Sequence, residues 1–146
     1  MIRPTFDTFD ELWAQGIVGV QPRSGIDGFL GIVVTSVDPG RLVAEMPVTP
    51  ALMTFVGNMH GGCLSALCDH VLGVVMYPVM PQGYWAATTE FKINLLAPVT
   101  TGVCRATSEI IAMTRRMAVV RIDVENEGRM VAAAQGTCTI VAPKTA

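Results

Sequence analysis

The residues best suited to chemistry in this sequence stand within one stretch, Gly57 to Pro78. His60 is followed directly by Gly61 and Gly62, and Asp69 stands seven positions after the second glycine. Glycines that open a helix leave its first backbone N–H groups uncovered, and the helix dipole adds partial positive charge there. Such a helix start is suited to bind a carbonyl oxygen as it becomes an oxyanion.

Asp69 is the one acid in an otherwise apolar segment, which we expect to form a buried helix from the glycine pair to Pro78. A buried carboxylate without a partner is costly, so its presence favours a functional role. Because a carboxylate in apolar surroundings is suited to accept a proton, we interpret Asp69 as a candidate general base.

Helical geometry limits how these residues act together. His60 and Asp69 are half a turn out of phase, so His60 must lie in the loop before the helix if both act. Gly62 and Asp69 are nearly in phase but roughly 10 Å apart along the axis, too far to serve one carbonyl. Either Asp69 is unrelated to the helix start, or the oxyanion donors come from another subunit. The second option predicts a dimer with antiparallel central helices.

These residues also have purely structural interpretations. A Gly-Gly pair before a helix is most often a turn, and a lone histidine at a helix start is more often a hydrogen-bonding group than a catalyst. Asp69 is harder to explain in this way because of the cost of burying it.

Composition predicts one domain over residues 1–146 that associates with copies of itself. Apolar residues make up 51% of the chain and charged residues only 15%, which is low for the surface of a monomer. The low charge favours a homotetramer over a dimer. The formal net charge of −2 gives no reason to expect nucleic acid as a partner.

The sequence predicts a cytoplasmic protein with no membrane, metal or cofactor partner. Its start has no apolar signal region, and the longest apolar stretch, Cys63 to Met80, is interrupted by Asp69 and His70. The four cysteines show no Cys-x-x-Cys spacing, and two histidines cannot easily complete a zinc site. We expect reduced, mostly buried thiols.

The remaining pattern predicts an α+β fold. We expect a helix over Thr5 to Gln15 with Thr5 as its cap, a loop from Gly16 to Gly28, and a hairpin that turns at Asp38-Pro39-Gly40. In the fourth strand from the end, alternation groups Thr88 with Glu90 and Lys92. A curved antiparallel sheet wrapped around the helix would bury it. The expected strands are Phe29 to Val37, Arg41 to Val48, Trp85 to Ala97, Val103 to Ala112, Met117 to Glu125 and Met130 to Val141, with the last four in a meander.

One pattern in the chain is familiar. Gly57-x-x-His60-Gly61-Gly62, with Asp69 on the following helix, resembles the hotdog-fold acyl-CoA thioesterases, and most closely their phenylacetate-pathway (PaaI-like) branch. The resemblance covers nearly the whole chain and includes a long strand that ends in Asn-Leu-Leu-Ala-Pro at residues 94–98. It implies a hotdog fold, in which a curved antiparallel sheet wraps one long central helix.

The resemblance implies roles for the matching positions. Asp69 would be the general base or nucleophile that acts at an acyl-CoA thioester. Gly61, with Gly62, would donate backbone N–H groups to the carbonyl oxygen, and His60 would polarise or position the thioester. Thr88 matches a Ser or Thr that assists the water in some members. The active site in this family lies between two subunits.

Four residues, in two places in the chain, are candidates for binding the substrate. Relatives often carry an asparagine six positions before the histidine, where this chain has Thr54, and Asn58 is nearby but out of register. Either Thr54 takes over the contact with the carbonyl or the carbonyl is held less well. Arg115 and Arg116 stand where relatives often place basic residues near the CoA phosphates, although two arginines in a turn are more often simply solvated.

Three functions are open at this point. The first is hydrolysis of an acyl-CoA to a free acid and CoA. The second is hydration or dehydration of an acyl thioester, which the residues flanking His60 disfavour. The third is a non-catalytic module that binds acyl-CoA. The sequence leaves the acyl group undetermined among aromatic and medium-chain acyl groups.

Overall fold

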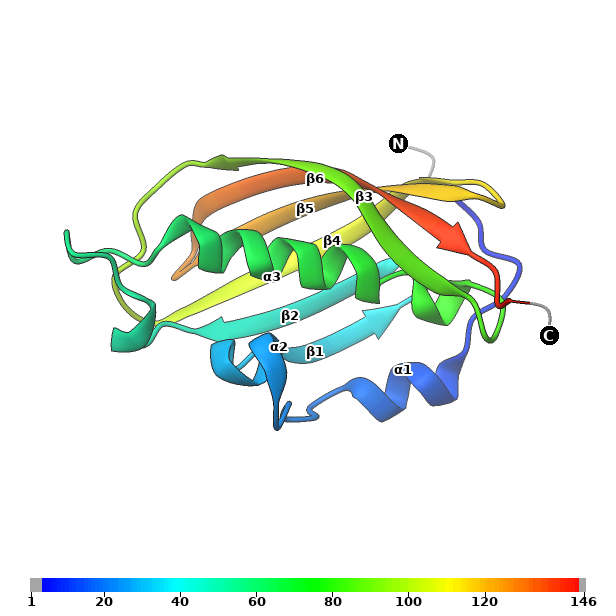
Figure 1. Ribbon diagram of the computed structural model, residues 1–146, viewed down its shortest axis with the longest axis horizontal. Helices are drawn as coiled ribbons and strands as arrows, with labels where there is room; N and C mark the ends of the chain where they lie inside the picture. Colours follow the sequence, from blue (N-terminus) through cyan, green and yellow to red (C-terminus); the bar gives the residue numbers. More distant parts are fainter. Residues whose placement is uncertain (1–3, 145–146) are drawn as a thin grey trace.

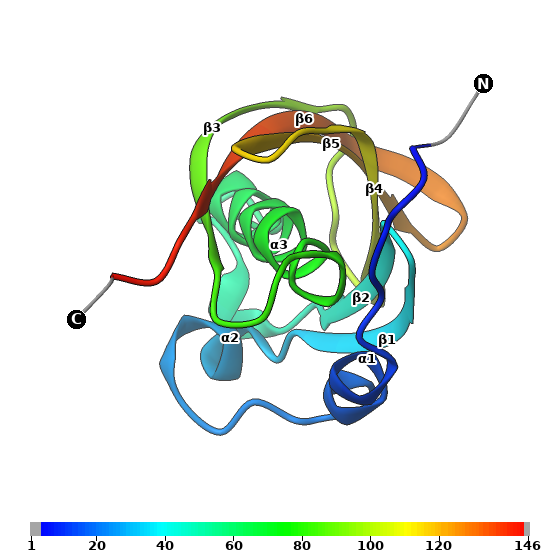
Figure 2. The ribbon, with the colours of Figure 1, turned by 90° about the vertical axis from the view of Figure 1, so that its right-hand side faces the viewer.

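A six-stranded antiparallel sheet curves around one long helix, α3, in the computed structural model, which describes residues 4–144 (Figures 1 and 2). The expected α+β class is confirmed. The helices are α1 (Glu11–Ile17), α2 (Gly25–Leu30) and α3 (Gly61–Val74). The strands are β1 (Val33–Asp38), β2 (Arg41–Pro47), β3 (Trp85–Leu95), β4 (Val103–Met113), β5 (Met117–Asn126) and β6 (Arg129–Val141).

The strand order is β1-β2-β4-β5-β6-β3, so the expected meander of the last four strands is wrong. β4, β5 and β6 do form a meander, but β3 pairs with β6 instead of β4. The segment between β3 and β4 is not a hairpin turn. It crosses the end of the sheet, where the Leu96 N–H donates to the Val131 carbonyl (2.8 Å) and the Arg129 guanidinium donates to the Pro98 carbonyl (2.7 Å). β3 therefore becomes an edge strand.

α3 is the centre of the hydrophobic core. Its buried side chains recur at helical spacing and face the concave side of the sheet. By length and composition the segment Gly61–Val79 is apolar enough to cross a membrane, but half of it is buried inside the molecule, as expected of a core helix. The buried residues of α3 are Leu64, Leu67, Cys68, Val71 and Leu72.

One face of α3 is left open, and this corrects an expectation. The helix lies between β3 on one side and α2 on the other, as the end view shows (Figure 2). Gly62 and Asp69 on the intervening face are exposed to solvent. The expectation that Asp69 is buried is therefore wrong for the single chain, because the sheet does not close over this face.

The N-terminal third differs most from expectation. α1 begins at Glu11 because the Asp10 carboxylate accepts the Trp13 N–H at 2.9 Å, so Asp10 and not Thr5 is the cap. Residues 4–9 instead cross one end of the sheet. The expected loop contains α2, which ends where Gly31 adopts φ 68°, so β1 starts four residues later than expected.

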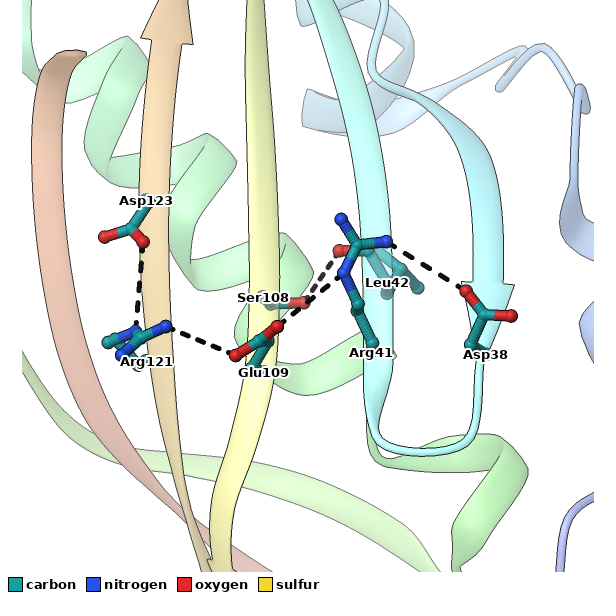
Figure 3. A network of polar contacts seen from close by, with 7 residues as sticks. All are labelled: Asp38, Arg41, Leu42, Ser108, Glu109, Arg121 and Asp123. Atoms are coloured by element: carbon teal, nitrogen blue, oxygen red, sulfur yellow. Dashed lines mark hydrogen bonds and ion pairs between the residues drawn. The ribbon is translucent and has the colours of Figure 1, made fainter. Parts of the chain in front are cut away.

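The convex face of the sheet carries a row of charges of alternating sign across β1, β2, β4 and β5 (Figure 3). Arg41 lies 4.0 Å from Asp38 and 3.7 Å from Glu109, and Arg121 lies 3.2 Å from Glu109 and 3.8 Å from Asp123. These cross-strand pairs support register, although partly exposed ion pairs contribute little stability. The sheet separates this row from α3, so we treat it as structural.

Gly136 in β6 allows β3 and α3 to approach closely. An added Cβ would overlap the Leu72 side chain, the Phe91 Cβ and the Glu90 carbonyl oxygen. We predict that Gly136→Ala lowers the free energy of unfolding by about 1–3 kcal/mol, because the backbone of β3 cannot move aside easily. Gly16→Ala is the control, since the space around Gly16 is open. Urea denaturation checks both, and equal stability of the two variants would contradict this packing.

Candidate active site

His60 caps the start of α3. Its Nδ1 accepts the Gly62 N–H at 2.8 Å, and its own backbone N–H donates to the Leu52 carbonyl at 2.8 Å. An imidazole that accepts at Nδ1 carries its proton on Nε2 in the neutral form. The exposed side chain therefore presents Nε2–H as a hydrogen-bond donor at the mouth of the helix.

A side chain at either Gly61 or Gly62 would meet a different neighbouring residue. A Cβ on Gly62 would lie 2.9 Å from His60 Nδ1, so glycine makes room for the folded-back imidazole. A Cβ on Gly61 would lie 2.5 Å from Leu95 Cδ1. Within residues 4–144 the Gly61 N–H has no hydrogen-bond partner, so it remains available to an oxygen atom of a ligand. A cavity of about 250 Å³ adjoins it between α3 and the end of β3.

The loop before His60 is closed by its own polar groups. The Thr54 hydroxyl lies 2.9 Å from the Asn58 carbonyl oxygen and 3.2 Å from Asn58 Oδ1. The Asn58 amide in turn donates to the Met59 carbonyl at 3.2 Å. Both residues thus hold the loop in shape, and the contacts with substrate that the sequence suggests for them stay predictions. Phe55 at the tip of the loop is 102% exposed.

Asp69 and Thr88 line one pocket of about 320 Å³ between α2, α3 and β3. The sequence pattern places Thr88 on the outer face with Glu90, but a β-bulge between the two residues changes the alternation. Thr88 pairs with the buried Cys138, whereas Glu90 accepts a hydrogen bond from the Thr137 hydroxyl at 2.7 Å on the outer face. The bulge thereby turns Thr88 toward the face of α3 that carries Asp69.

A protonated thiol lies beneath this pocket. Burial raises the pKa of Cys138 to about 11, a hydrogen bond with Thr88 lowers it, and the nearby Asp69 raises it. The thiol donates to the Leu72 carbonyl at 3.5 Å. All four cysteines are free and three are buried, as expected, and burial raises the pKa of Cys68 to about 12 and that of Cys104 to about 11. These neutral thiols are poor nucleophiles.

The two groups of functional residues lie apart on the open face of α3. Gly61 and Asp69 are separated by eight residues, or about 12 Å along the helix axis. The helix is continuous from Gly61 to Val74, so this separation is fixed. One chain therefore brings together Asp69 with Thr88, and His60 with Gly61, but does not bring the two pairs together.

A contact between Asp27 and His70 in the wall of this pocket is absent from the sequence-based predictions. The Asp27 carboxylate lies 3.2 Å from His70 Nδ1, which joins α2 to α3 next to Asp69. The sequence predicts a loop where α2 lies, because this segment is rich in glycine. One available signal is Ser24-x-x-Asp27, the spacing that often opens a helix.

Arg115 and Arg116 are both exposed in the turn between β4 and β5. The Arg116 carbonyl accepts the Ile140 N–H at 2.8 Å, and Ile140 pairs with Ala86 near the start of β3. The turn therefore lies toward the Thr88 end of β3. Arg115 also lines a cavity of about 650 Å³ formed with residues 4–8. Neither arginine lines the pocket of Asp69.

Comparison with known proteins identifies the family of this chain. The sequence pattern of the thioesterase superfamily matches residues 56–133, a range that contains His60, Asp69 and Thr88. The chain is 26% identical over 103 residues to 1,4-dihydroxy-2-naphthoyl-CoA hydrolase of Listeria monocytogenes, covering 70% of this chain and 84% of that protein.

Two further similarities extend the comparison. The proofreading thioesterase EntH of Klebsiella pneumoniae is 32% identical over 76 residues, 52% of this chain and 56% of that protein. The structure is also similar to that of the PaaI protein from the phenylacetic acid degradation operon of E. coli, with a TM-score of 0.75 and 26% identity over 81% of this chain and 85% of that one.

The capping contact of His60 predicts one tautomer. In the neutral imidazole, ¹⁵N spectra should show an unprotonated Nδ1 and a protonated Nε2 for His60. Gly62→Ala should shift the Nδ1 signal because the added methyl displaces the ring from the cap. A protonated Nδ1 in the unaltered protein would contradict this arrangement of the helix start.

Proposed function

This chain belongs to the thioesterase superfamily as a PaaI-like hotdog thioester hydrolase, and we propose that it hydrolyses an acyl-CoA with Asp69 as the general base. Acyl-CoA thioesterase activity in general follows from the family and from relatives that are named as thioesterases. The observation that carries the finer proposal is the pocket shared by Asp69 and Thr88.

The proposed reaction uses groups at both ends of the open helix face. Asp69 accepts a proton from a water molecule, held with the help of Thr88, and the water oxygen attacks the thioester carbonyl carbon. The Gly61 N–H and the His60 Nε2–H stabilise the negative charge on the carbonyl oxygen. The C–S bond then breaks, the carboxylic acid forms, and the thiolate of CoA takes up the proton.

In this proposal, Gly62 supports the site indirectly. Its N–H is bonded to His60 Nδ1, so it fixes the imidazole while Gly61 donates to the substrate. Thr54 and Asn58 act similarly, because their mutual hydrogen bonds shape the loop that leads to His60. A direct contact between Thr54 and the carbonyl, as the family asparagine implies, remains part of the proposal.

We propose that each active site is shared by two chains. The carbonyl donors at Gly61 and the carboxylate of Asp69 are about 12 Å apart in one chain, so one substrate needs donors from one chain and a base from the other. An antiparallel dimer would bring them together. The unpaired edge of β3 and the exposed side chain of Phe55 offer surface for such contact.

We extend the proposal to the assembly and its location. The low charge content of the chain supports a homotetramer built from two such dimers. The four free cysteines fit a cytoplasmic protein, because thiols stay reduced there.

The substrate is proposed from the pocket and from the relatives. An aromatic acyl group suits the pocket of Asp69, whose apolar lining includes Ile26, Val74 and Tyr77. The Listeria relative is named for a naphthoyl-CoA, and the E. coli relative belongs to the phenylacetic acid degradation operon. In this proposal Arg115 and Arg116, which are exposed toward the same end of β3, bind the CoA phosphates.

The proposed role of Asp69 predicts the effect of removing its charge. Asp69→Asn should lower kcat by about 10²- to 10⁴-fold in an assay of free-thiol release from aromatic and aliphatic acyl-CoAs, because water is no longer deprotonated. Asp123→Asn on the convex face serves as the matched control and should keep wild-type activity.

Three outcomes would count against the proposal. Full activity of Asp69→Asn would remove this residue from the mechanism. Loss of 2-enoyl-CoA absorbance without thiol release would indicate hydration. Calorimetric binding of acyl-CoA without turnover by the wild type would indicate a binding module.

A further inference from the structure

A contact between the Asp27 carboxylate and the His70 imidazole joins α2 to α3 beside the proposed base. Asp27 Oδ1 and His70 Nδ1 are 3.2 Å apart, and the His70 side chain is only 18% exposed while that of Asp27 is 42% exposed. A helix of six residues is too short to be stable alone. Its N-cap, Ser24, makes no side-chain hydrogen bond to it. The position of α2 therefore depends on tertiary contacts such as this pair.

Ile26, the residue before Asp27, forms one wall of the Asp69 pocket. Ile26 lines that pocket and is 62% exposed in the single chain. Phe29, one turn further along α2, is 63% exposed but does not line it. Ile26 thus presents an apolar side chain to whatever lies beside Asp69, and Phe29 offers a comparison residue on the same short helix.

The α3 side of the pocket has unused space at Gly73. Gly73 on α3 also lines it, and no atom lies within 4 Å of the position that a Cβ on Gly73 would occupy. The pocket combines apolar or small side chains with the carboxylates of Asp27 and Asp69, and its lining, drawn from the described residues, contains no Lys or Arg. Such a lining fits the acyl part of a thioester better than the phosphates of CoA.

We infer that Ile26 determines which acyl groups the enzyme accepts, and that the contact between Asp27 and His70 positions α2 so that Ile26 closes the pocket. The inference rests on the proposed function. Ile26 sets the width available to the acyl chain or ring beside the carbonyl carbon, and Gly73 leaves depth on the α3 side. Asp27 and His70 themselves line the pocket, so their contact fixes both its polar wall and the placement of Ile26.

The test compares kcat and KM across CoA thioesters of increasing acyl size, from acetyl through hexanoyl to phenylacetyl and naphthoyl. Ile26→Ala should raise the ratio of kcat/KM for naphthoyl to that for acetyl by about tenfold, because a few methylene groups in an apolar pocket are worth that much discrimination. Ile26→Phe and Gly73→Leu should lower the same ratio. Phe29→Ala is the matched control and should leave the ranking of substrates unchanged.

Separate variants test whether the contact between Asp27 and His70 positions α2. Asp27→Asn and His70→Gln should change the ranking of substrates in the same direction as Ile26→Ala does. Asp27→Glu keeps the carboxylate and should keep the wild-type ranking. Thermal melts of each variant show whether the fold is intact. A loss of stability alone would lower activity on all substrates together and would not change their order.

An unchanged ranking in Ile26→Ala and Ile26→Phe would overturn the inference, as would an equal shift in Phe29→Ala. Failure of the proposed function looks different, because the wild type would then release no thiol from any substrate. In that case the ranking is measured as Kd for the same CoA thioesters by calorimetry, and the same comparison of variants decides.

Discussion

The separation of two chemical groups on one rigid helix is the constraint on which the rest of the molecule depends. The free Gly61 N–H and the Asp69 carboxylate share the open face of α3 about 12 Å apart, more than one thioester carbonyl can span. The sheet keeps the helix straight by burying its other faces, and it leaves this face uncovered between β3 and α2. We therefore propose that an active site built on this helix needs a second chain.

The parts that could be predicted from sequence are those with strong local signals. The glycine pair, the apolar run of α3 and the existence of the strands β4 and β5 follow from the sequence pattern alone, and the structure confirms them. The pairing of β3 was predicted wrongly because the segment after it was interpreted as a hairpin turn. Proline and glycine between β3 and β4 resemble a hairpin turn, but the hydrogen bonds that carry this segment across the sheet come from distant residues such as Arg129.

The candidate site was predicted in its residues but not in its geometry. Alternation alone puts Thr88 on the wrong face, because a single-residue bulge has no signature in this strand. The bulge is accommodated by Gly136 on the neighbouring strand, whose missing side chain leaves room for the Glu90 carbonyl. α2 and the Asp27–His70 pair were missed because a six-residue helix rich in glycine has little periodicity.

A mixed oligomer tests the shared site most directly. Gly61→Pro removes only the N–H donor, since proline is tolerated at the first position of a helix, and Leu95→Ala in the same chain makes room for the ring. This chain and an Asp69→Asn chain are both expected to be inactive. Co-expressed with different affinity tags and purified through both, they should regain activity, up to about half of the wild type for a dimer, because one site is intact. A doubly tagged oligomer as inactive as its parents, with Leu95→Ala alone active, would contradict the account.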